Sequence, residues 1–139
     1  MKENGYNSKD FHKYCDDKEP TLTLVKTTKD KIFGGFTPLN WKNNKYNKID
    51  NSNQTFIFSL NTIKKYDLLN KKNPAIRTNE GPYFGDCDLH LKSNMKNGES
   101  YANESCNFLS NNNLELTGGK GEYENFETEE LEVYKVILK

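Results

Sequence analysis

Short stretches with apolar residues at every second position recur along the chain, and this is the period of β-strands that bury one face. Residues 21–27, TLTLVKT, follow it, and a four-residue turn leads to a second apolar stretch over residues 32–36. These two segments are predicted to form a β-hairpin. In a third strand Phe56, Phe58 and Leu60 form the apolar face. The strands after the hairpin are predicted over residues 54–61, 75–78, 88–92 and 129–138.

Helical spacing occurs near the beginning of the chain. Phe11, Tyr14 and Cys15 fall on one face of a short helix, and Ser8 is placed to cap it. The helix is expected to end before Pro20, because proline disrupts the helix interior.

Polar segments rich in Asn and Lys separate the predicted strands. One follows Trp41, and a second, rich in Lys, follows residue 61. Residues 81–86 are predicted to be a turn, and residues 94–113 a loop with Phe108 packed back against the core.

These elements predict an α+β fold that is mostly β, in which two antiparallel sheets pack as a sandwich with a few short flanking helices. The chain has 139 residues, which suits one compact domain over residues 1–139. Only 33% of the residues are hydrophobic and the mean hydropathy is −0.98, so a large share of the chain is expected in loops.

Two adjacent glycines, Gly34 and Gly35, interrupt the second predicted strand. No helix follows them and no acid, base or nucleophile lies beside them, which argues against a phosphate-binding or catalytic turn. Positions without side chains let a strand bend or a neighbouring group approach closely. The apolar residues around the pair are expected to be buried: Ile32, Phe33, Phe36 and Trp41.

The formal net charge is zero, which excludes the basic excess of a typical nucleic-acid binder. The charge is nevertheless unevenly distributed. Residues 21–77 contain eleven Lys or Arg and three Asp or Glu, whereas residues 99–132 contain one Lys and nine Glu. This asymmetry is compatible with a docking surface for a charged partner, but cross-strand neutralisation and solvated loops are the favoured interpretation.

No apolar run approaches the roughly 20 residues that a membrane-spanning helix requires, so no membrane insertion is expected. The first ten residues are too polar for a signal peptide. The three cysteines, Cys15, Cys87 and Cys106, are widely spaced and odd in number, which favours a reducing compartment over a disulfide framework. We therefore expect an intracellular, cytoplasmic protein.

The stretch DCDLH, residues 86–90, is the strongest candidate for chemistry. On an extended segment Asp86, Asp88 and His90 project to one face, as a divalent metal site would need. No second group of ligands accompanies them. The alternative is a strand with a polar outer face and an inner face that carries Leu89 and Leu91, and we predict no metal site.

Two other motifs carry less weight. TGGKGE, residues 117–122, lacks the Ser or Thr that follows lysine in a phosphate-binding loop, and no amphipathic helix follows it. Pairing of Cys87 or Cys106 with His12 or His90 would give a thiolate nucleophile, but nothing in the local sequence supports it. No catalytic or cofactor-binding residue is predicted, and the acidic residues 122–132 are expected to form a solvated face.

Five segments in order resemble the TLDc domain of oxidation-resistance and related eukaryotic proteins. They read FHKYCDDKEPTLTLVKT, KIFGGFT followed by Trp41, TFIFSLN, GPYFGDCDL and FETEELEVYKV. Each is short, but five in the right order cover nearly the whole chain. The resemblance implies a two-sheet sandwich with flanking helices, which agrees with the independent prediction.

The resemblance transfers positions of structural motifs rather than an active site. These positions are Thr21, Leu22, Phe33, Gly34, Gly35, Trp41, Phe58, Ser59, Leu60, Gly81, Pro82, Phe84, Gly85, Asp88, Leu89, Glu132, Val133 and Tyr134. Family domains have a further strand and helix before the segment that here contains Phe11 and His12. We therefore expect the domain to be incomplete at its N-terminus.

The resemblance implies two alternative functions. The first is a noncatalytic interaction module in oxidative-stress protection that associates with the vacuolar proton-pumping ATPase (V-ATPase). The second is a thiol-dependent antioxidant activity through Cys87 or Cys106. Docking is favoured because Cys87 lies between Asp86 and Asp88, whereas a reactive thiolate needs an electropositive setting.

Overall fold

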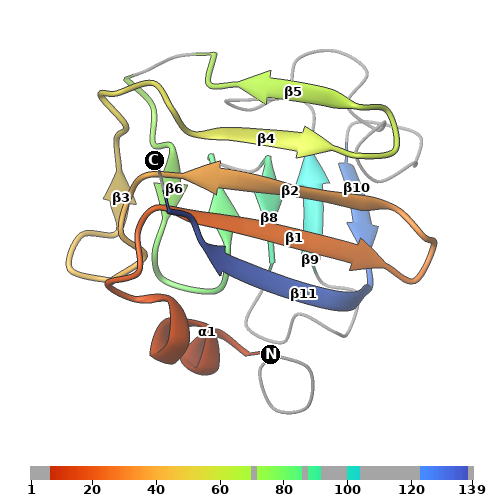
Figure 1. Ribbon diagram of the computed structural model, residues 1–139, viewed down its shortest axis with the longest axis horizontal. Coiled ribbons are helices and arrows are strands. Elements are labelled where there is room, and N and C mark those ends of the chain that lie inside the picture. The colour runs from red at the N-terminus through yellow and green to blue at the C-terminus, as the bar shows by residue number, and fades with distance from the viewer. Residues whose placement is uncertain (1–6, 70–71, 86–87, 92–99, 104–122, 138–139) are drawn as a thin grey trace.

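β-Strands dominate the computed structural model, which describes residues 7–69, 72–85, 88–91, 100–103 and 123–137 (Figure 1). One helix, α1 (Ser8–Cys15), precedes them. The strands are β1 (Thr21–Thr27), β2 (Ile32–Thr37), β3 (Asn47–Lys48), β4 (Phe56–Ser59), β5 (Lys64–Asp67), β6 (Ile76–Arg77), β7 (Tyr83–Phe84), β8 (Leu89–His90), β9 (Ser100–Asn103), β10 (Tyr123–Phe126) and β11 (Thr128–Lys135).

The strands form two antiparallel sheets. The five-stranded sheet has the order β11-β1-β2-β4-β5, and the six-stranded sheet has the order β10-β9-β8-β7-β6-β3. Figure 1 shows the five-stranded sheet in front and the other behind it, with the strands of the two running across each other. The predicted sandwich of antiparallel sheets is confirmed. Within the described part of the chain it is accompanied by a single helix rather than a few.

The helix begins one residue earlier than its predicted cap implies. Asn7 is the N-cap, and its side chain accepts a hydrogen bond from the backbone N–H of Asp10 at 2.9 Å. Phe11 and Cys15 are buried as expected, but Tyr14 is exposed. No helix in the described residues is long and apolar enough to cross a membrane.

The inner faces of β1 and β4 are the reverse of what hydrophobicity alone indicates. Thr21 and Thr23 of β1 face the core, whereas Leu22 and Leu24 are only partly covered on the outer face. In β4 the inner residue is Ile57. The face with Phe56, Phe58 and Leu60 is the outer one.

The physical reason for this reversal is the set of large rings that the core has to hold. Trp41 is fully buried, and its ring packs edge-to-face on Phe11 and on Phe84, with ring centroids 5.2 and 5.5 Å apart. Small residues on the inner faces of β1 and β2 leave space for these rings. The buried hydrophobic cluster comprises Phe11, Cys15, Val25, Phe33, Trp41, Ile57, Leu68, Ala75, Ile76, Phe84, Leu89, Leu91, Phe126 and Leu131.

The prediction that the apolar residues around Gly34 and Gly35 are buried is therefore only partly confirmed. Phe33 and Trp41 are buried, but Ile32 and Phe36 lie on the outer face and are partly exposed. Phe36 stacks on Phe56 there, with ring centroids 5.5 Å apart.

β7 lies inside residues 81–86, which the sequence predicted as a turn, and four further strands lie in or beside segments predicted as loop. β3 and β5 occur in the Asn- and Lys-rich segments, and β9 lies inside residues 94–113. The fourth, β10, pairs with β9 and is joined to β11 by Glu127 alone, so that the chain passes directly from one sheet to the other. These strands lack a clear alternation of apolar residues, which explains why the pattern missed them. Phe108 lies outside the described residues.

Candidate functional site

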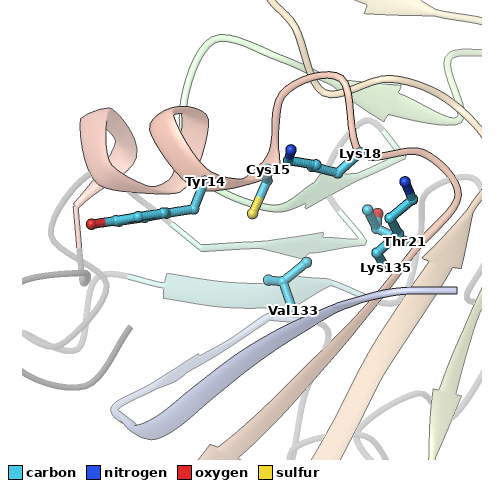
Figure 2. Close-up of a pocket in the computed structure, with 6 residues that line it drawn as sticks. All are labelled: Tyr14, Cys15, Lys18, Thr21, Val133 and Lys135. Carbon is cyan, nitrogen blue, oxygen red and sulfur yellow. The ribbon is translucent and has the colours of Figure 1, made fainter.

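A cleft of about 250 Å³ lies between α1 and the adjacent edge of the five-stranded sheet (Figure 2). Tyr14 and Cys15 come from the end of α1, and Lys18 from the loop that leads to β1. The remaining lining residues come from the sheet: Thr21, Val133 and Lys135. A cleft of this size is smaller than the roughly 300–1,000 Å³ of pockets for drug-sized ligands, and it fits a single large side chain.

The local sequence explains how these groups converge. Thr21 pairs with Lys135 across the β1–β11 ladder, and Val133 lies two residues earlier on the same side of β11. Figure 2 shows Val133 directed from β11 toward α1, with the thiol of Cys15 on the facing side. The cleft therefore combines an apolar floor with two exposed lysines, Lys18 and Lys135.

The Cys15 thiol is protonated at neutral pH. Burial raises the pKa of Cys15 to about 12, and the negative charge of the neighbouring Asp16 acts in the same direction. Nucleophilic cysteines require the thiolate form. Cys15 therefore serves as a small apolar residue in the cleft and not as a nucleophile.

Thr21 links the cleft to the core. Its hydroxyl accepts a hydrogen bond of 2.9 Å from the indole N–H of Trp41, and both side chains are buried. The position is therefore constrained by packing. Sequence reasoning marked Thr21 as a motif position without indicating this bond.

Both histidines of the chain contact Glu80. The Nε2 atom of His12 donates to the backbone carbonyl of Glu80 at 2.9 Å, and its Nδ1 atom lies 2.7 Å from a carboxylate oxygen of Asp16. The Nε2 atom of His90 lies 2.8 Å from the Glu80 carboxylate, and the His90 ring stacks on Tyr83 at a centroid distance of 3.7 Å. This network connects α1 to β7 and β8, and none of its members lines the cleft in Figure 2.

The prediction that residues 86–90 have a polar outer face is wrong. Asp88 and His90 are buried and do not form a polar outer face, because Tyr83 and Glu80 pack against the histidine. Leu89 and Leu91 are fully buried, as predicted. Within the described ranges, no group of three or more His, Cys, Asp or Glu residues could hold a metal ion.

Several sequence candidates fall outside the described residues: Asp86, Cys87, Cys106 and residues 117–122. The family-motif positions that are buried are Thr21, Phe33, Gly34, Gly35, Trp41, Ser59, Gly81, Pro82, Phe84, Gly85, Asp88 and Leu89. Those that are partly or fully exposed are Leu22, Phe58, Leu60, Glu132, Val133 and Tyr134. Only Thr21 and Val133 of these positions line the cleft.

The two glycines have separate roles. A Cβ atom on Gly35 would lie 2.5 Å from the Phe84 ring, which belongs to the opposite sheet. A Cβ atom on Gly34 would lie 1.8 Å from the carbonyl oxygen of Thr23 and 3.0 Å from the ring of Phe58. The prediction of close approach is confirmed at both positions.

Asp50 is a buried carboxylate that the sequence reading did not single out. It accepts hydrogen bonds from the backbone N–H groups of Ser52, Gln54 and Thr55 and from the hydroxyls of Ser52 and Thr55. Burial acts to raise the pKa of Asp50, but these hydrogen bonds outweigh it and the pKa lies below its ordinary value. Asp followed by Ser two residues later is a turn signal that would have indicated these hydrogen bonds.

Comparison with known proteins gives matches over most of the chain. The family model described as the TLDc domain matches residues 1–137. TBC1 domain family member 24 of Xenopus tropicalis is 26% identical over 121 residues, which cover 83% of this chain and 21% of the relative. The protein of the same name from Xenopus laevis is 30% identical over 80 residues, which cover 54% of this chain and 14% of the relative. The chain thus spans about a fifth or less of these relatives.

Proposed function

Because the chain belongs to the TLDc domain family, we propose that it is a noncatalytic docking module in protection against oxidative stress, and that its partners are peripheral subunits of the V-ATPase. It acts in the cytoplasm by binding a protein surface. No chemical step at its own side chains is required.

The cleft between α1 and β11 is the observation that carries this proposal. Its volume of about 250 Å³ suits one side chain of a partner, and Lys18 and Lys135 place two positive charges beside it. An acidic segment with one apolar or aromatic residue would complement both features. Rim charges of this kind contribute mainly to the rate and specificity of association.

The protonated thiol supports binding over catalysis at this site. With a pKa raised to about 12, Cys15 is not available for the thiolate chemistry that peroxide reduction requires. The alternative function, a thiol-dependent antioxidant activity, depends on Cys87 or Cys106.

Affinity capture tests the proposal. The immobilised chain is expected to recover V-ATPase peripheral subunits from a lysate. The double variant Lys18→Glu, Lys135→Glu is expected to recover about tenfold less, since both rim charges are inverted. Lys29→Glu is a control for charge inversion elsewhere on the surface, because Lys29 is exposed in the turn at the opposite end of β1, and each single variant, Lys18→Glu and Lys135→Glu, is compared with it.

Two results would overturn the proposal. One is equal recovery by the wild type and the double variant, which would remove the cleft from the docking surface. The other is peroxide turnover by the purified chain that is lost on Cys87→Ser or Cys106→Ser, together with no recovery of ATPase subunits.

A further inference from the structure

The outer face of the five-stranded sheet carries a continuous apolar surface. We call it the aromatic face and define it by Leu22, Leu24, Gly34, Phe36, Phe56, Phe58 and Tyr134. Gly34 is buried, and the side chains of the other residues are partly or fully exposed. In Figure 1 this face is toward the viewer, and none of the described elements lies over it. Contiguous apolar patches of this kind on soluble domains usually mark interaction sites.

Contacts within the aromatic face order its side chains. The Phe36 ring stacks on Phe56, and Phe56 lies 6.2 Å from Phe58 between ring centroids. The ammonium group of Lys65 lies 4.7 Å from the Phe56 ring centroid. The Phe58 ring lies close to Gly34, where a Cβ atom would be 3.0 Å from its Cζ. These contacts restrict the conformations of the three phenylalanine side chains, which lowers the conformational entropy lost on binding.

The strand register arranges these residues in two rows. One row runs Glu132, Leu24, Gly34, Phe58 and Lys65 from β11 to β5. The next row runs Tyr134, Leu22, Phe36, Phe56 and Asp67. In both rows β2 is the middle strand, with two strands on each side. The first row therefore ends in an acidic residue at one edge and a basic residue at the other.

This arrangement is self-complementary under one symmetry operation. A two-fold axis that runs along β2, in the plane of contact, exchanges β11 of one copy with β5 of the other. It places Glu132 opposite Lys65 of the second copy, and Tyr134 opposite Asp67 of the second copy. Each pair occurs twice, as an isologous interface requires. Between them the leucines of β1 meet the phenylalanines of β4.

We propose that the aromatic face is a self-association surface that pairs with the same face of a second copy of this chain. The apolar centre supplies the driving force, and the Glu132–Lys65 pairs fix the orientation. An axis perpendicular to the strands that passes through the first row would place Glu132 opposite Glu132 and Lys65 opposite Lys65 of the second copy, and repulsion disfavours it.

The size of the face predicts a weak dimer. Five strands at a spacing of about 4.8 Å and about six residues at 3.3 Å each give a face of roughly 480 Å². Two such faces bury about 960 Å², which lies at the low end for specific interfaces and is typical of transient complexes. The dimer is therefore expected to form at high micromolar concentration.

Sedimentation velocity over a concentration series tests this proposal. The chain has a mass of 16.1 kDa, and we expect the average mass to rise toward twice that value as concentration increases. Lys65→Glu alone and Glu132→Lys alone should each weaken association by about tenfold, because each creates two like-charge pairs. The double variant Lys65→Glu, Glu132→Lys should recover most of the association, since it reverses both Glu132–Lys65 pairs, although it loses the 3.1 Å ion pair between Lys65 and Asp67 within each chain.

Two controls isolate the effect. Lys45→Glu makes the same charge change on an exposed loop residue away from the aromatic face and should leave the mass curve unchanged. Circular dichroism establishes that each variant is folded before it is compared. A wild type that stays monomeric at about 1 mM, or a folded double variant as weak as the single variants, would overturn the proposal. Both outcomes are independent of ATPase capture through the cleft.

Discussion

The ring of Phe84 occupies the space in which a side chain at position 35 would begin. A Cβ atom on Gly35 would lie 2.5 Å from Cζ of that ring, across the two sheets. Phe84 cannot move away easily, because it is fully buried and its ring also packs edge-to-face with Trp41. The two sheets therefore approach closely at this contact.

Gly35→Ala is expected to lower the free energy of unfolding by about 1–3 kcal/mol, the usual cost of overpacking a well-packed core. Urea denaturation followed by tryptophan fluorescence measures it. Adding Phe84→Leu to Gly35→Ala should recover part of the lost stability, because leucine is smaller than phenylalanine and leaves room for the new methyl group. Strict additivity of the two substitutions would contradict direct contact between these positions.

Thr21→Val is expected to destabilise the protein by about 1–3 kcal/mol, because it leaves the buried indole N–H of Trp41 without its acceptor. Thr21→Ser keeps the hydroxyl and should cost less. The measurement is again the free energy of unfolding. A valine variant as stable as the wild type would show that this hydrogen bond contributes nothing to stability.

The stability of the protein should depend on pH through Asp50. Its folded-state pKa lies below the ordinary value, so the folded protein binds fewer protons than the unfolded chain in mildly acidic solution. The stabilisation is therefore complete above the unfolded-state pKa of about 3.9 and is lost as pH falls through the lower, folded-state pKa.

Asp50→Asn tests this dependence. At pH about 7 the variant should be less stable by about 2 kcal/mol or more, since hydrogen bonds to a charged acceptor are lost. The difference between the variant and the wild type should shrink as pH falls toward about 3. A difference that stays constant with pH would show that the carboxylate charge is not the stabilising element.

Cys15 should resist alkylation in the native protein. Its pKa of about 12 leaves almost no thiolate at pH 8, and the side chain is buried. Iodoacetamide labelling with peptide mapping should find Cys15 unmodified in native buffer and modified in denaturant. Rapid native labelling of Cys15 would contradict its assignment as an inert residue of the cleft.

The elements that could be predicted from the sequence are mostly those in which apolar residues repeat with the period of a strand or a helix. Alternation predicts β1, the apolar stretch after a short turn predicts β2, the β-branched and aromatic residues of 129–138 predict most of β11, and helical spacing predicts α1. The alternation in β1 did not reveal which face is buried, because leucines lie outside and threonines inside. That assignment depends on where the rings of Trp41 and Phe84 lie, which is a long-range property.

The candidate site was less predictable for a similar reason. The cleft is made of residues from the two ends of the described chain, and no local motif links Lys18 to Lys135. Its members carry no chemical signature beyond charge. The contact of both histidines with Glu80 was equally hidden, because residues 12 and 80 are far apart in sequence.

Pairing between β1 and β11 has a consequence for how the protein is made. The first strand finds its neighbour more than a hundred residues later, at Thr128–Lys135. During synthesis the chain emerges from its N-terminus, so β1 must wait with one edge unpaired until β11 leaves the ribosome. The five-stranded sheet can close only when translation of this segment is complete. Folding of this sheet is therefore expected to be late and slow, as is usual when distant segments must meet.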